Sequence, residues 1–346
     1  MSRKRDNFNI FEYLLFTAAT LLVFALCVSQ GSVRIPFKDT VILIWNAIRR
    51  LPAPDTIASP AIILAVRLPR VICVALTGAS LSLCGGAMQG LLRNPLADGS
   101  TLGVSAGASL GAVIAIAFGI TMPSLPFAGT MVMAILFAFI SLIIILALAY
   151  RLDYSLSTNT IILIGVIYSM FVSSILSLII AFASDRIRHI TFWTMGSLAG
   201  SSYSNAIVLL VALVIFGGII FLHARELNAF AISEDNARHI GINTRRVKLI
   251  ILISVSVLIG VSVSIGGTIG FVGLVTPHMA RMLTGPNHKK LFPASLFGGA
   301  IFLMLADLLA RVLFSPTELP LGVVTSFIGA IVFVYIFYST RKTGNV

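Results

Sequence analysis

Three arginines stand out because they lie at the ends of long apolar runs. Arg67 and Arg70 are three residues apart, so a helix would carry both on one face. Arg311 lies near the end of another apolar run, four residues after Asp307. Taken alone, these residues indicate cations at a membrane surface that bind lipid phosphates. For Arg311 an ion pair with Asp307 is the alternative, because charges inside a membrane usually pair.

A second group of polar residues predicts a short helix in the longest charged stretch, residues 226–248. Ser233 is suited to the N-cap, and the acids Glu234 and Asp235 suit the positive end of the helix that would follow. Gly241 suits the position just after the last turn, and Thr244 could cap the next helix. This pattern favours a structured helix that includes Arg238 over a solvated loop, which is the alternative.

Small residues recur at every fourth position in two apolar runs. The first row is Gly78, Ser82, Gly86 and Gly90, and such spacing lets helices approach closely in lipid. The second row is Gly165, Ser169, Ser173 and Ser177. Helix packing explains the second row, but so does a mildly polar wall along a substrate path. Both interpretations stay open from the residues alone.

The sequence contains no pattern typical of a catalytic centre. The phosphate-binding motif G-x-x-x-x-G-K-[ST] does not occur, so we expect no ATP site of this kind. The five histidines are scattered without metal-ligand spacing, and the three cysteines all lie within apolar runs. We therefore expect neither enzymatic activity nor a bound metal or cofactor on this chain.

The composition indicates an integral membrane protein. Hydrophobic residues make up 58% of the 346 residues and charged residues only 10%, and the mean hydropathy is +1.03. So few charges could not cover the surface of a soluble domain of this size. The net charge of +12 is spread between apolar runs instead of forming one patch. This distribution fits membrane topology and excludes nucleic acid as the expected partner.

The apolar runs predict an all-α fold with ten membrane spans in one polytopic domain, residues 1–346. The expected spans are 10–28, 71–92, 104–118, 127–149, 160–182, 206–222, 249–265, 269–282, 291–313 and 321–338. A short interfacial helix is expected within residues 185–200. We expect a retained first span instead of a cleaved signal peptide, and both termini in the cytoplasm, since the inner segments would hold most of the cations.

Two halves, residues 1–183 and 184–346, are expected to be inverted relative to one another. The sequence similarity between residues 80–97 and 262–280 supports this, since each segment contains two adjacent glycines followed by a proline. Inverted repeats are common in transporters.

Several motifs together resemble the FecCD-type permeases, the membrane subunits of ABC importers for iron–siderophore complexes, haem and cobalamin. The first half contains RLPR from Arg67, then GAxLxxxGxxxQ, RNPLAD and LGVSAGA. The second half contains GxIGFVGLVTPHMAR, LADLLAR and ELPLGVVTSFIGA. The motifs occur in the order typical of the family and cover nearly the whole chain. One departure is Asp98-Gly99, where the family usually has an acidic residue followed by proline.

The resemblance implies roles for the residues singled out above. It implies that acidic residues of a substrate-binding protein dock on Arg67, Arg70 and Arg311, and that the helix beginning after Ser233 couples to an ATPase. It implies that the row from Gly165 to Ser177 borders the translocation path. It also implies a cytoplasmic gate formed by Asn94, Leu96, Ser157, Thr158 and Asn159, although a helix stop and an N-cap explain these two segments equally well.

We therefore predict a permease in a bacterial plasma or inner membrane. It would pair with a second permease copy or paralogue, two ATP-binding cassette subunits and an extracytoplasmic binding protein. The alternative is a secondary transporter driven by an ion gradient. Such proteins usually carry acidic ion sites inside the membrane, and here Asp307 is the one candidate, with Arg311 beside it.

Overall fold

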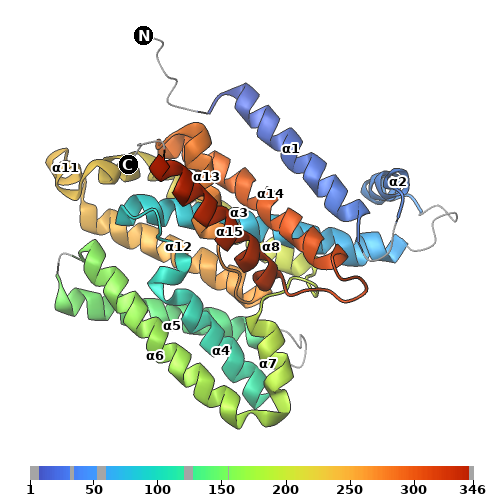
Figure 1. Cartoon of the computed structure of the whole chain (residues 1–346), viewed down its shortest axis with the longest axis horizontal. Helices are drawn as coiled ribbons and strands as arrows, with labels where there is room; N and C mark the ends of the chain where they lie inside the picture. Colours follow the sequence, from blue (N-terminus) through green and yellow to red (C-terminus); the bar gives the residue numbers. More distant parts are fainter. Residues whose placement is uncertain (1–7, 32–34, 53–59, 121–127, 155, 343–346) are drawn as a thin grey trace.

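The computed structural model describes residues 8–31, 35–52, 60–120, 128–154 and 156–342 (Figure 1). Within these ranges the regular secondary structure is helical throughout. The first half contains α1 (Ile10–Ser29), α2 (Phe37–Ile48), η1 (Ile62–Arg67), α3 (Leu68–Leu92), η2 (Gly99–Leu102), α4 (Val104–Phe118), α5 (Ala128–Leu152) and α6 (Thr158–Phe182). The second half contains η3 (Ser184–Arg186), α7 (Ile187–Thr194), α8 (Tyr203–Ala212), η4 (Leu213–Gly217), α9 (Gly218–Leu222), α10 (Ala224–Ile232), α11 (Glu234–His239), α12 (Thr244–Gly266), α13 (Val272–Thr284), α14 (His288–Val312) and α15 (Leu321–Lys342).

Seven helical stretches of the described chain are long and apolar enough to cross a membrane. They are Ile10–Ser29, Ile62–Leu92, Gly129–Leu152, Thr158–Phe182, Tyr203–Leu222, Thr244–Gly266 and His288–Val312. The other three predicted spans are helical but shorter or less continuous: α4, α13 with an internal Pro277, and the apolar part of α15. The structure is thus an all-helical membrane protein. The start predicted for the fourth span, Phe127, lies outside the described residues.

Local sequence signals explain where several helices begin and end. Asn9 and Glu12 form a reciprocal capping box at the start of α1, with bonds of 2.8 and 2.7 Å. The second span ends at Arg93, which has a left-handed φ of 49°, two residues before Pro95. A helix, α7, is present where a short interfacial helix was predicted within residues 185–200.

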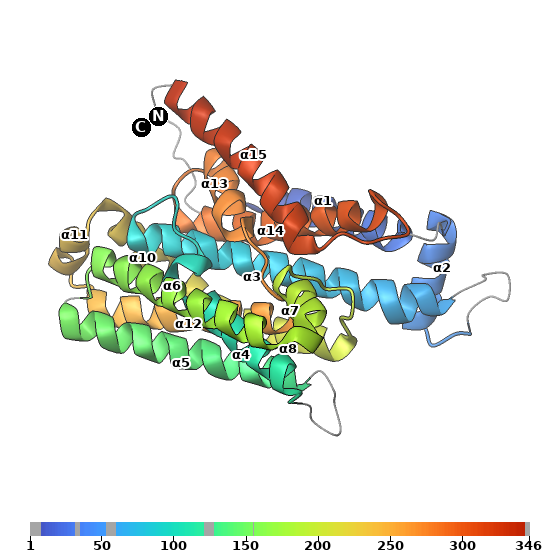
Figure 2. The same ribbon diagram turned by 60° about the horizontal axis from the view of Figure 1, so that its bottom comes forward.

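Helices α3 and α12 run through the middle of the bundle (Figures 1 and 2). Of the apolar window in α12, 78% is buried, whereas only 6% of the window in α1 is buried. Helix α3 packs against α14, α13 and α12. The central position of α3 explains its composition, because a helix surrounded by other helices needs small residues on several faces.

The first small-residue row brings α3 close to α13 and α14. A methyl group added to Gly78 would collide with the carbonyl oxygen of Gly299 in α14. Ser82 accepts a hydrogen bond of 2.7 Å from the hydroxyl of Thr276 in α13, and the ring of His288 covers Gly90. The packing function predicted for this row is confirmed.

Neighbouring glycines in α14 provide a matched test of this packing. A methyl group on Gly299 would collide with the carbonyl of Gly78 and with Ser82, whereas one on Gly298 would meet nothing within 4 Å. We expect Gly299→Ala to lower the free energy of unfolding by about 1–3 kcal/mol through overpacking. Gly298→Ala should be neutral or stabilising by up to about 1 kcal/mol. Denaturation of the purified protein in detergent measures both, and equal effects would contradict the close approach.

Candidate functional site

The three arginines meet at one end of the bundle, but they are buried there. Arg67 and Arg70 are each 5% exposed and Arg311 is 3% exposed. Asp307, 1% exposed, accepts from Arg70 at 2.9 and 3.0 Å and from Arg311 at 2.9 Å. Glu318 accepts from Arg70 at 2.8 Å. We call these five residues the arginine cluster, and its guanidinium groups are already paired within the chain.

Two members of the arginine cluster also cap the C-terminal end of α1. Arg67 donates to the carbonyls of Val28 and Ser29 at 3.3 and 2.9 Å. Arg311 donates to the carbonyls of Cys27 and Gln30 at 3.0 and 2.8 Å. The last four carbonyls of a helix lack intrahelical partners and carry partial negative charge, so cations stabilise them.

The burial of all three arginines argues against the interpretation that they bind lipid phosphates. The ion pair of Arg311 with Asp307 is present, and Asp307 also binds Arg70. The contacts to α1 were not predicted, since nothing in the spacing of Arg67 or Arg311 relates them to residues 27–30. Docking of a binding protein on Arg67, Arg70 and Arg311 stays a prediction.

The predicted short helix of segment 226–248 is present as α11. Ser233 caps it by accepting from the backbone N–H of Asn236 at 2.9 Å. At the other end, Gly241 has a φ of 87° and its N–H donates to the carbonyl of Arg238 at 3.0 Å. The N–H of Ile242 donates to the carbonyl of Ala237, which completes a Schellman motif.

Two details of this segment differ from the expectation. Asn243, not Thr244, caps α12 by accepting from the N–H of Arg246 at 3.0 Å. A further helix, α10, precedes α11 and follows α9 directly. Asp235 is exposed, whereas Glu234 is partly buried. Segment 226–248 is thus structured along most of its length instead of forming an open loop.

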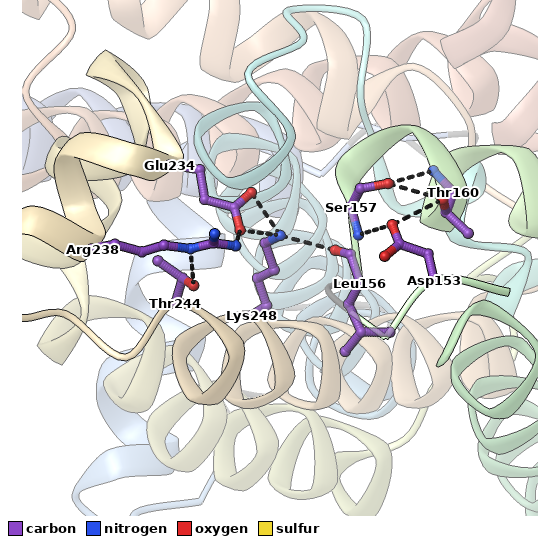
Figure 3. Close-up of polar contacts among 8 residues, drawn as sticks. All are labelled: Asp153, Leu156, Ser157, Thr160, Glu234, Arg238, Thr244 and Lys248. Atoms are coloured by element: carbon purple, nitrogen blue, oxygen red, sulfur yellow. Dashed lines mark hydrogen bonds and ion pairs between the residues drawn. The ribbon is translucent and has the colours of Figure 1, made fainter. Parts of the chain in front are cut away.

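A buried lysine joins α11 to the turn between α5 and α6 (Figure 3). The Nζ of Lys248 lies 2.9 and 2.8 Å from the two carboxylate oxygens of Glu234 and 2.9 Å from the carbonyl oxygen of Leu156. Arg238 binds the same carboxylate at 2.8 Å and the hydroxyl of Thr244 at 3.3 Å. Lys248 does not stand out in the sequence, where it is only the last residue of the charged stretch 226–248.

The turn that Lys248 contacts leads into one of the two predicted gate segments, residues 157–159. Ser157 caps α6, and its own N–H donates to Asp153 at 3.0 Å. Thr160 bonds both Ser157 and Asp153 through its hydroxyl, at 2.9 and 3.3 Å (Figure 3). Thr158 is half-buried and Asn159 is exposed. The N-cap expected at Ser157 is confirmed, and the gate function stays a prediction.

The other predicted gate segment forms a tight turn after α3. The side chain of Asn94 accepts from the N–H of Leu96 at 2.9 Å, and Leu96 is exposed. The end of α3, the start of α6 and α11 all lie at the same end of the bundle (Figures 1 and 2). The arginine cluster, at the ends of α1 and α14, lies at the opposite end.

The residues of the second small-residue row have different environments. Gly165 is buried, and its carbonyl oxygen would lie 3.0 Å from a methyl group on Gly103. Ser169 is half-buried and bonds the carbonyl of Gly165, while Ser173 and Ser177 are exposed. The row therefore combines packing at one end with exposed hydroxyl groups at the other. Its place beside a translocation path stays a prediction.

Long apolar helices with a structured polar segment at one end define a membrane-spanning protein. Among the described residues, no group of three or more histidine, cysteine or acidic side chains could hold a metal ion.

Comparisons with known proteins identify the family. The model of the FecCD transport family matches residues 19–339. The chain is 38% identical over 344 residues to an uncharacterized ABC transporter permease, YvrB, of Bacillus subtilis, with 99% of this chain and 97% of the relative covered. It is 36% identical over 283 residues to the cobalamin import system permease BtuC of Halobacterium salinarum, with 82% and 74% covered.

A solved structure of an ABC transporter of the metal-chelate type, in an inward-facing conformation, resembles the fold with a TM-score of 0.81. The two chains are 29% identical, and the match covers 94% of this chain and 98% of the other. The chain belongs to the FecCD transport family. It is an ABC transporter permease, a multi-pass membrane subunit that is not itself an enzyme.

Proposed function

We propose that this permease imports a metal chelate such as an iron–siderophore complex, haem or cobalamin, with energy from ATP hydrolysed by partner subunits. The observation that carries the proposal is α11, a capped helix tied to the α5–α6 turn by Lys248. A mere connector would need neither the caps nor the buried lysine. The relative named for cobalamin import and the metal-chelate transporter structure support the substrate class.

The alternative of an ion-driven transporter is weakened by the arginine cluster. Ion or proton sites inside a membrane usually depend on an acidic residue that can bind the ion. Asp307 is an acidic residue near the end of α14, within the ninth predicted span, and both of its oxygens are bonded to arginines. We infer that Asp307 holds the cluster together instead of binding a transported ion.

Reconstitution tests the proposed function. The permease, its ATPase and its binding protein would be placed in liposomes with labelled cobalamin, haemin or a ferric siderophore. We expect uptake of one of these chelates with ATP and Mg²⁺, and none with a non-hydrolysable ATP analogue. Uptake driven by a proton or sodium gradient without the ATPase would support the secondary transporter instead.

The proposed assembly contains two permeases, two ATP-binding cassette subunits and one binding protein. The pairing of permeases would use exposed apolar side chains on α6 and α15 of the single chain. Examples are Phe171 and Leu178 on α6, and Phe327 and Tyr335 on α15. A second copy or a paralogue would cover part of these faces and place Ser173 and Ser177 beside the path. Docking of the binding protein on the arginine cluster would require Asp307 and Glu318 to share the guanidinium groups with incoming carboxylates.

The packing of the helices supports ten spans in two related halves. Helix α3 of the first half packs on α14 of the second, and α12 of the second half packs on α5 of the first. Within the halves, α4 packs on α5 in the first and α13 packs on α14 in the second. Each contact made by the first half thus has a counterpart made by the second, as two repeats related by a pseudo-twofold axis would produce.

We propose that both termini and α11 face the cytoplasm of a bacterial cell, with α7 and the arginine cluster outside. Residues 1–7 and 343–346 lie outside the described residues, so exposed positions on α7 and α11 provide the test. In spheroplasts, a membrane-impermeant maleimide should label His189→Cys directly and Asn236→Cys only after permeabilisation. The three native cysteines are buried and give little background. Labelling of both positions from the same side would contradict this orientation.

A further inference from the structure

Lys248 lies where three segments of the chain meet. Its side chain is 1% exposed. A lysine ammonium has three donors, and the structure places three acceptors around it: two oxygens of Glu234 and the carbonyl oxygen of Leu156 (Figure 3). Lys248 itself belongs to the first turns of α12. A buried charge with every donor engaged holds its partners firmly, because losing any one of them leaves charge unpaired.

The acceptors belong to two different elements. Glu234 is the first residue of α11, directly after its cap. Leu156 is buried in the α5–α6 turn, directly before the residue that caps α6. Leu156 has a φ of 52°, a backbone angle that residues other than glycine rarely adopt. The N–H of Leu156 donates to the carbonyl of Asp153 at 2.9 Å, and the carbonyl of Leu156 accepts from Lys248. Hydrogen bonds to both the N–H and the carbonyl of Leu156 thus stabilise its unfavourable backbone conformation.

The neighbouring Arg238 makes a different link. It binds Glu234 and Thr244, and so joins α11 to α12. Its side chain is 51% exposed, so water competes for the guanidinium group. The hydrogen bond to the carbonyl of Leu156 is made by Lys248.

We infer that Lys248 is a positioning residue that transmits the displacement of α11 to the turn that begins α6. The inference rests on the proposed function, since it assigns to this lysine the connection between the ATPase-coupling helix and the predicted gate at residues 157–159. When α11 moves, the Glu234–Lys248–Leu156 chain carries the α5–α6 turn with it. Without Lys248, α11 and the start of α6 would move independently.

The test compares Lys248→Met with the matched variant Lys290→Met. Methionine keeps the length of the side chain but donates no hydrogen bond. Lys290 pairs with Glu12 at 3.9 Å, and both side chains are partly exposed, so its loss removes a lysine–carboxylate pair without touching the link. In the reconstituted complex, Lys248→Met should reduce the chelate imported per ATP hydrolysed by at least about tenfold. Lys290→Met should leave this ratio unchanged. An unchanged ratio in Lys248→Met would overturn the inference.

A second measurement separates this inference from the proposed function. Spin labels at Asn236 on α11 and Asn159 on α6, both exposed, report the distance between the two elements in liposomes. The distance distribution should be narrow in the parent and in Lys290→Met, and clearly broader in Lys248→Met. Should Lys248→Met fail to fold, Glu234→Gln removes the charge pair and should also broaden the distribution. Identical distributions would overturn the link, whereas a narrow distribution in a complex without ATP-driven import would overturn only the proposed function.

Discussion

Asp307→Asn is expected to lower the free energy of unfolding by about 3–5 kcal/mol, because it leaves two buried guanidinium groups without their shared anion. Arg70 and Arg311 both bind Asp307 and are almost completely buried. Asparagine has nearly the same shape, but it replaces one acceptor oxygen with an NH₂ group that faces other donors. The two arginines would then repel each other, and the capping of α1 by Arg311 would weaken. Thermal or SDS denaturation of the purified protein measures the loss.

Glu12→Gln is the control for this effect. Glu12 pairs with Lys290 at 3.9 Å, and the two side chains are 31% and 19% exposed. A partly solvated pair of this kind contributes about 0–1 kcal/mol. The two carboxylate-to-amide changes therefore differ in burial more than in chemistry. Comparable losses of stability in both variants would show that the arginine cluster does not depend on Asp307.

Ala237→Pro is expected to abolish ATP-driven uptake while the bundle remains folded. Ala237 is buried in α11, and its N–H donates to the carbonyl of Ser233 at 3.1 Å. Proline removes this bond and clashes with the preceding turn, which costs about 3 kcal/mol and disrupts a helix of only six residues. Glu234 would then lose its position beside Lys248. Chelate uptake and stimulation of ATP hydrolysis by the loaded binding protein should both fall to background.

Ala237→Gly distinguishes the disruption of α11 from the loss of the Ala237 methyl group. Glycine keeps the backbone N–H and costs about 1 kcal/mol in helix propensity. We expect this variant to retain most of its uptake, with only a modest decrease in stimulated ATP hydrolysis. Normal uptake by Ala237→Pro would show that α11 does not transmit motion from the ATPase. A full loss of uptake in Ala237→Gly would instead indicate a direct contact of the Ala237 methyl group.

Much of the fold could be predicted because its signals are local. Long apolar runs predicted helices at all ten expected spans, and the structure contains a helix at each. The caps at Ser157 and Ser233 and the left-handed Gly241 follow from residue type and short spacing. The row from Gly78 to Gly90 also indicated a close helix contact, although its partners on α13 and α14 were not evident. The family motifs extended these predictions to functions that the residues alone left open.

Only the tertiary structure decided the partners of the buried charges. Arg70 binds Asp307 across 237 positions of sequence, and Lys248 binds the carbonyl of Leu156 across 92. Hydropathy marks such residues as cations at the edges of spans, where lipid phosphates, solvent and other chains are equally suitable partners. Which of these is present depends on where α1, α11 and the α5–α6 turn end in space. The cost of burying an unpaired charge then makes the pairing obligatory once packing has brought these ends together.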